Sequence, residues 1–82
     1  MEKFCTFLNR KCKTNVNSIR KIANLSKITH PYLLDLMNGR KNPPDIKTQI
    51  NIANALELSS KEKVIFFDLA AKERRRIAGR YL

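Results

Sequence analysis

The two cysteines and the single histidine are the residues of this chain that most often act as nucleophiles or metal ligands. Cys5 and Cys12 fall on one face of a predicted helix, but a separation of seven residues corresponds to about 10 Å of helical rise, which is beyond the reach of a disulfide. His30 is distant from both in sequence, and the spacing matches no zinc-binding signature. We interpret the cysteines as small buried apolar residues. The sequence therefore predicts no metal site and no cofactor.

The sequence also lacks the residue patterns that are typical of enzymes. It contains no Gly-rich loop that would hold a phosphate group, and no Ser–His–Asp or Cys–His set at a spacing that suggests nucleophilic catalysis. We predict that the protein is not an enzyme. Its function must then depend on binding.

The charge of the chain indicates an anionic partner. Lys and Arg number 17 against 7 Asp and Glu, and the formal net charge is +10. Nucleic acid attracts such a surplus through its phosphates, and an anionic membrane surface is the alternative. No apolar run is long enough to span a bilayer, and the N-terminus has no signal-peptide pattern. We expect a soluble, cytoplasmic protein that does not bind membranes and whose partner is nucleic acid.

The basic residues are unevenly distributed along the chain. Residues 1–41 carry 9 basic and 2 acidic residues, whereas residues 42–82 carry 8 and 5. The first half of the chain is therefore the better candidate for contact with phosphate.

Helices must position these charges. The 82 residues are enough for one small domain, and the hydrophobic fraction of 43% with only two Gly and three Pro favours an all-α fold. Apolar residues at helical spacing predict helices over residues 2–13, 19–25, 30–37, 46–56 and 60–77. The predicted N-caps are Ser18, Thr29, Asp45 and Ser59, the last forming a capping box with Glu62.

The same periodicity predicts which side chains form the core and which do not. Arg40 to Pro44 is expected to be an exposed, rigid, basic loop. The expected core residues are Phe4, Cys5, Phe7, Leu8, Cys12, Ile19, Ile22, Ala23, Leu25, Ile28, Leu33, Leu36, Met37, Ile46, Ile50, Ile52, Ala53 and Leu56.

The stretch from Ser18 to Gly39 carries the most information about function. It predicts two short helices joined by a tight turn, an arrangement that can insert its second helix into the DNA major groove. With Leu33 at the centre of the buried face of that helix, Pro31 and Asp35 fall near the opposite side and Leu34 falls at its edge. His30 lies at the N-terminal end. These four residues are the ones that the helix would offer to base edges.

The segment IRKIANLSKITHPYLLDLMNGRKNPP resembles the lambda-repressor-like, Cro/Xre-type family of helix-turn-helix DNA-binding proteins. The following IANALELS and FFDLAAKER segments resemble later parts of small phage and mobile-element members, so the likeness covers nearly the whole chain. The matching residues of the first segment are Ile19, Arg20, Ile22, Ala23, Ile28, Thr29, Tyr32, Leu33, Asn38, Gly39, Arg40 and Pro43.

The resemblance implies a five-helix, lambda-repressor-like domain with its helix-turn-helix at about residues 18–39. It implies that base contacts come from His30, Pro31, Leu34 and Asp35. The phosphate contacts that it implies involve Ser18, Arg20, Thr29, Tyr32, Asn38, Arg40 and Lys41. Tyr32 could instead stack on a base.

The sequence departs from the family pattern at several positions. Lys27 occupies the usual glycine of the turn, where a positive φ would cost a lysine about 1 kcal/mol. Ile19 replaces a glutamine that reaches phosphate in many members. Pro31 disfavours helical geometry at His30, so we expect the third helix to begin one residue later than in other members of the family. Asp35 would repel phosphate unless it pairs with Arg40 or accepts a hydrogen bond from a cytosine amine.

The last predicted helix, residues 60–77, is apolar on more than one face. One interpretation is a dimer interface formed by Ile65, Phe66 and Leu69, and the other is a small bundle that covers the helix on two sides. The basic residues from Lys72 to Arg76, with Arg80, could bind phosphate or simply suit the end of a helix.

These observations lead to one functional hypothesis and one alternative. We expect a sequence-specific DNA-binding transcriptional regulator, a repressor that acts as a homodimer on a palindromic operator. Its partners would be double-stranded DNA and a second copy of the chain. The alternative is a protein-binding module on the same fold, either an antitoxin or an inhibitor of a nucleic-acid enzyme.

Overall fold

The computed structural model describes residues 2–79 and the side chains of residues 2–74. Within that range the chain forms helices and no strands, which confirms the prediction of an all-α protein. Arg75 and Arg76 of the predicted basic run lie outside the described side chains, and Arg80 lies outside the described residues. The helices are α1 (Phe4–Lys13), α2 (Ile19–Leu25), α3 (His30–Met37), α4 (Ile46–Ala55) and α5 (Ser60–Gly79).

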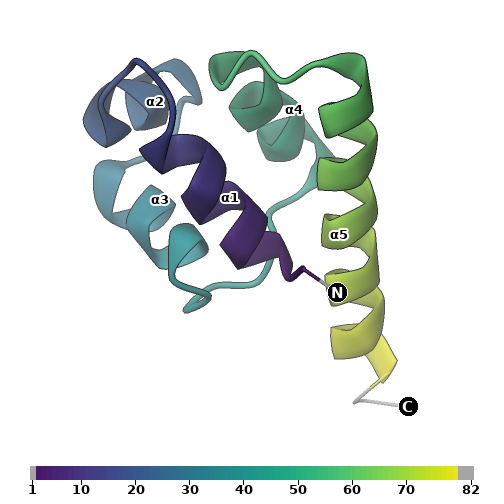
Figure 1. Ribbon diagram of the computed structural model, residues 1–82. Coiled ribbons are helices and arrows are strands. Elements are labelled where there is room, and N and C mark those ends of the chain that lie inside the picture. Colours follow the sequence, from purple (N-terminus) through teal and green to yellow (C-terminus); the bar gives the residue numbers. More distant parts are fainter. Residues whose placement is uncertain (1, 80–82) are drawn as a thin grey trace.

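Helix α1 lies at the centre of the molecule, between the α2–α3 pair and α5 (Figure 1). It contacts α2, α3 and α5, while α4 packs against α2 and α5. Helix α5 runs along one side as the longest element (Figure 1). The first and last helices therefore close the fold on each other.

An aromatic cluster forms the part of the core between α1 and α5. The fully buried Phe66 ring lies 5.1 Å from the Phe4 ring and 6.0 Å from the Phe7 ring, measured between centroids. The buried apolar residues of the described chain are Phe4, Phe7, Leu8, Cys12, Ile22, Ala23, Leu33, Leu36, Met37, Ile52, Ala53, Ala55, Leu56, Leu58, Phe66, Leu69 and Ala70.

The two cysteines differ in their surroundings. Cys12 is a buried free thiol, and its burial raises the pKa to about 12. This confirms its interpretation as a core residue. Cys5 is only half-buried and lies against Gly39, where a Cβ added to the glycine would come within 3.2 Å of the Cys5 Sγ.

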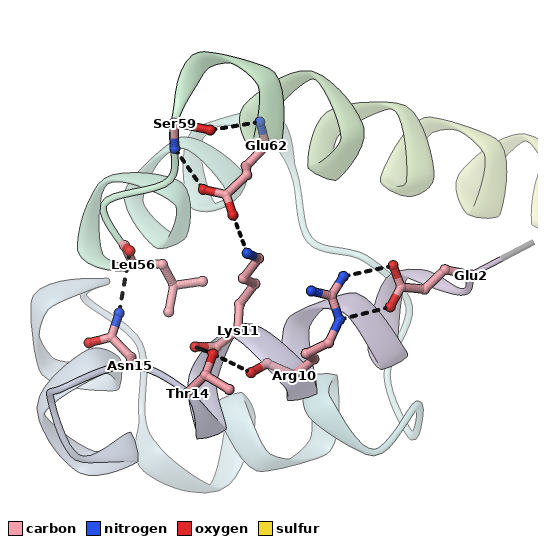
Figure 2. Close-up of polar contacts among 8 residues, drawn as sticks. All are labelled: Glu2, Arg10, Lys11, Thr14, Asn15, Leu56, Ser59 and Glu62. Carbon is pink, nitrogen blue, oxygen red and sulfur yellow. Dashed lines mark hydrogen bonds and ion pairs between the residues drawn. The ribbon is translucent and has the colours of Figure 1, made fainter.

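Polar contacts join the N-terminal segment to the start of α5 (Figure 2). Lys11 of α1 forms an ion pair with Glu62, whose carboxylate also accepts a hydrogen bond from the Ser59 N–H at 2.9 Å. The Asn15 side chain donates to the Leu56 carbonyl at 3.3 Å (Figure 2). These contacts set the position of α1 relative to the α4–α5 turn.

The predicted N-caps are confirmed, whereas the first helix starts at Phe4 and not at residue 2. The Ser18, Thr29 and Asp45 side chains each accept a hydrogen bond from the backbone N–H three residues later, and Ser59 forms the expected capping box with Glu62. Helix α3 begins at His30, as the predicted range has it, with Pro31 in its first turn, so Pro31 does not exclude His30 from the helix. A proline is tolerated there because its missing N–H would have no partner within the helix.

Helices α2, α3 and α4 all end in Schellman motifs, in which a residue with positive φ reverses the chain. This residue is Lys27 in α2 (φ 61°), Gly39 in α3 (φ 74°) and Glu57 in α4 (φ 55°). Lys27 thus adopts the positive φ whose cost we considered for this position. The residue after each of them donates its N–H to a carbonyl five positions earlier, at 2.9–3.1 Å.

The predicted core of α4 is wrong at two positions. Ile46 is 62% exposed and Ile50 is 45% exposed, whereas Gln49 is buried. The helix is turned so that Gln49 Nε2 can donate to the Pro44 carbonyl at 2.7 Å. Because Gln49, Ile52 and Ala53 share one face, Ile46 and Ile50 fall on its margin.

The end of α2 also differs from expectation. Leu25 is 50% exposed, and the neighbouring Ser26 is buried instead, with its hydroxyl donating to the Ile22 carbonyl at 2.7 Å.

The end of the α3–α4 loop is less exposed than expected. Pro43 and Pro44 are buried, which corrects the expected exposed loop at these two residues. The Arg74 guanidinium covers them and donates to both of their carbonyls, at 3.2 and 2.8 Å.

Candidate nucleic-acid interface

The candidate interface is built on the segment Ser18–Lys41, which we call the α2–α3 unit. The turn between its helices, Ser26–Thr29, is fixed by the left-handed Lys27 and by Ile28, which packs against the core. Leu33, Leu36 and Met37 bury one face of α3, so its opposite face is directed outward. Helix α3 is therefore packed on the core along one face and accessible to a partner along the other.

The four residues expected to contact bases are not equally accessible. Pro31 is exposed, while His30 and Asp35 are half-buried. Leu34 is also half-buried and packs against the core, so only part of its side chain is available to a partner. Pro31 and Leu34 lack hydrogen-bonding side chains. His30 and Asp35 therefore supply the polar chemistry of this set.

The residues expected to contact phosphate lie at both ends of α3. Ser18 and Arg20 at the start of α2, and Thr29 before α3, are exposed. The Ser18 and Thr29 hydroxyls accept hydrogen bonds as helix caps and can still donate their own proton. Arg40 and Lys41 are exposed at the other end of α3.

Tyr32 and Asn38 are partly committed to the fold. Tyr32 is half-buried and packs against the core. Asn38 is exposed, but its Nδ2 donates to the Leu34 carbonyl at 2.9 Å. Asn38 therefore helps to end α3 and offers less free hydrogen-bonding capacity than the sequence suggested.

A shallow depression of about 500 Å³ brings the starts of α2 and α3 together. It adds one basic residue that the sequence reasoning missed, Lys21, which is exposed and directly follows Arg20. Its position after a good N-cap was the available signal, because side chains in the first turn of a helix lie beside the free N–H groups. The lining residues are Ser18, Arg20, Lys21, Ala23, Asn24, Ile28 and His30.

The opposite end of α3 holds an ion pair. Arg40 Nη1 lies 3.4 Å from Asp35 Oδ1, which is the pairing that the sequence offered as one outcome for Asp35. His30, which lines the depression, and Asp35 are five residues apart on α3, about 7.5 Å along the helix axis. The interface thus has two basic regions, one at each end of α3, with Asp35 between them.

The expected dimer residues on α5 are largely unavailable. Phe66 is fully buried and Leu69 is 8% exposed, because both pack inside the chain. The bundle covers α5 on two sides at these positions. Ile65 is 44% exposed and its neighbour Val64 is 69% exposed, so these two are the exposed large apolar side chains in the part of α5 whose side chains the structure describes.

The described part of the chain holds no group of three or more His, Cys, Asp or Glu residues that could bind a metal. None of the helices described is both long and apolar enough to cross a membrane. No family model, curated protein or solved structure matches this chain.

Proposed function

We propose that this protein is a sequence-specific DNA-binding regulator with a lambda-repressor-like helix-turn-helix formed by the α2–α3 unit. The observation that carries the proposal is the placement of basic groups at both ends of α3. Arg20 and Lys21, in the first turn of α2, lie beside the start of α3, and Arg40 and Lys41 follow its end. The eight residues of α3 span about 12 Å along the helix axis. Phosphate backbones line both sides of the major groove, which is about 12 Å wide, so a short helix placed in it would bring the cations at both of its ends near phosphate.

The helix starts add to this attraction. The N-termini of α2 and α3 carry free N–H groups and a partial positive charge, and both open toward the depression lined by Ser18 and His30. Backbone amides at such ends are common phosphate ligands. Contacts of this type fix the orientation of α3 without reading the sequence.

The biological role follows from this mode of binding. A compact protein that occupies an operator acts most simply as a repressor, by excluding polymerase. We propose a homodimer that binds a palindromic operator, since two copies double the number of base contacts. Val64 and Ile65 are the exposed apolar residues of α5 that would lie in its interface.

The test measures the affinity for duplex DNA by fluorescence anisotropy against salt concentration. Four basic residues predict a slope of log K against log [salt] of about −3 to −4 per protomer. Arg20→Ala and Lys41→Ala should each reduce the magnitude of the slope by about 1. The control Lys61→Ala removes an exposed charge from α5 and should leave the slope unchanged. Absence of binding at low salt would refute the proposal.

A protein-binding module on the same fold is the second candidate. The exposed Ile46 and Ile50 on one face of α4 favour it, since neither residue is needed by the core. In this role the protein would act as an antitoxin or as an inhibitor of a nucleic-acid enzyme. If this candidate is right, the protein should form a stoichiometric complex with another protein, and the complex should survive treatment with nuclease. Ile50→Lys should abolish the complex, and the wild type should have negligible affinity for DNA.

A further inference from the structure

The contact between Asp35 and Arg40 is set by the way in which α3 ends. The Schellman motif brings these residues together, with the Arg40 N–H donating to the Asp35 carbonyl at 2.9 Å. The same two positions usually hold an apolar pair. They are Ala23 and Ile28 at the end of α2, and Ala53 and Leu58 at the end of α4.

The end of α3 therefore carries a charged pair at the two positions that are apolar at the ends of α2 and α4. The Asp35 carboxylate is 31% exposed and pairs with the 68% exposed Arg40 guanidinium. The fold does not require this pair, because an exposed ion pair contributes little to stability. Stability therefore does not account for a charged pair at these two positions.

Asp35 is also isolated among the charges of the interface. It is the sole acidic residue between Ser18 and Lys41. The other acid in residues 1–41 is Glu2, which pairs with Arg10 of α1. A carboxylate on the outward face of a helix that approaches DNA would be repelled by phosphate. Arg40 offsets this repulsion while four of its five N–H donors remain for other contacts.

A carboxylate can only accept hydrogen bonds, and this restricts the base that it can recognise. In the major groove cytosine presents only its N4 amino donor. Guanine presents acceptors, and thymine presents an acceptor and a methyl group. Adenine presents its N6 donor next to its N7 acceptor. A carboxylate that accepted a hydrogen bond from N6 would place its second oxygen against N7, and the two acceptors would repel each other.

We infer that Asp35, held by Arg40, is a specificity-determining residue that selects a cytosine in each half-site of the bound DNA. The inference rests on the proposed function. The neighbouring residues of the outward face sharpen the selection, since Pro31 offers no hydrogen bond and Leu34 is half-buried. His30 reads at the other end of the helix.

The test selects bound duplexes from a random pool with the wild type and with Asp35→Asn. The wild-type pool should contain one cytosine position per half-site, preferred over the other bases by roughly ten- to a hundredfold. Asn can bond adenine at N6 and N7, so Asp35→Asn should convert that position to adenine and leave the others unchanged. Arg40→Gln should weaken binding but retain the cytosine preference.

Glu57→Gln is the matched control, because it neutralises an exposed acid in the α4–α5 turn. It should leave the selected sequences unchanged. A wild-type pool without a cytosine position, or one that Asp35→Asn leaves unaltered, would overturn this inference and leave DNA binding intact. Failure of the wild type to retain any duplex at low salt would overturn the proposed function itself.

Discussion

Substitution of Phe66 by alanine tests whether α5 is part of the core or of a dimer interface. The Phe66 ring is fully buried and has three aromatic neighbours, the Phe4, Phe7 and Phe67 rings at 5.1, 6.0 and 5.6 Å. Truncation of a buried phenylalanine to alanine costs about 3–5 kcal/mol of unfolding free energy. The lost ring contacts place Phe66→Ala near the upper end of that range.

A loss of this size is a large part of the total stability. A domain of 82 residues has a free energy of unfolding of about 4–12 kcal/mol. Phe66→Ala should thus lose a third or more of it. Phe66→Leu keeps most of the buried volume and loses mainly the ring contacts, so its cost should be about 1–2 kcal/mol.

Urea denaturation monitored by circular dichroism measures these differences. Val64→Ala is the matched control, because Val64 lies on the same helix and is 69% exposed. Its effect should stay within about 0.5 kcal/mol. The reasoning would be refuted if Phe66→Ala cost less than about 1 kcal/mol. A cost that changed with protein concentration would instead place Phe66 against a second copy.

Three further predictions concern single contacts. The ion pair with Lys11 is the largest cause that lowers the pKa of Glu62 from 4.5 to about 2. The stability that it contributes is complete above pH 4.5 and is lost as the pH falls toward 2. Below pH 4.5 the melting temperature should therefore fall less steeply with decreasing pH in Glu62→Gln than in the wild type. An equally steep fall in the variant would contradict this. Glu57→Gly should raise the free energy of unfolding by up to about 1 kcal/mol, because the residue has a φ of 55°. The same change at Glu73, inside α5, should lower it by a similar amount, and equal effects would refute the argument from strain. Arg74→Met removes the donor shown for the Pro43 carbonyl, whereas the Pro44 carbonyl keeps the hydrogen bond from Gln49, so the variant should cost about 1–3 kcal/mol in urea denaturation. An unchanged midpoint would show that the hydrogen bonds from Arg74 contribute nothing.

Local chemistry made the helix boundaries predictable. Ser18, Thr29 and Ser59 accept from N–H groups three residues away, so their role can be inferred without knowing the rest of the fold. The left-handed conformation of Lys27 was predictable for the same reason. The pairing of Asp35 with Arg40 was foreseen as one of two outcomes, since the end of a helix brings such positions together.

Long-range packing decided the remainder. The rotation of α4 depends on the bond from Gln49 to the Pro44 carbonyl and on the neighbouring helices, and these cannot be derived from the periodicity of α4 alone. The apolar set on α5 likewise could not be divided between core and interface. Its division depends on α1, whose Phe4 and Phe7 lie nearly the whole chain away in sequence.

This closure of α1 by α5 has a consequence for synthesis on the ribosome. Phe7 leaves the ribosome well before Phe66, and translation at about 5–20 residues per second separates the two by roughly 3–12 s. During that interval the apolar face of α1 has no partner from α5. A nascent chain therefore already contains α1 and the complete α2–α3 unit, while the aromatic part of the core still lacks Phe66. Apolar surface that is exposed in this way favours aggregation until synthesis is complete.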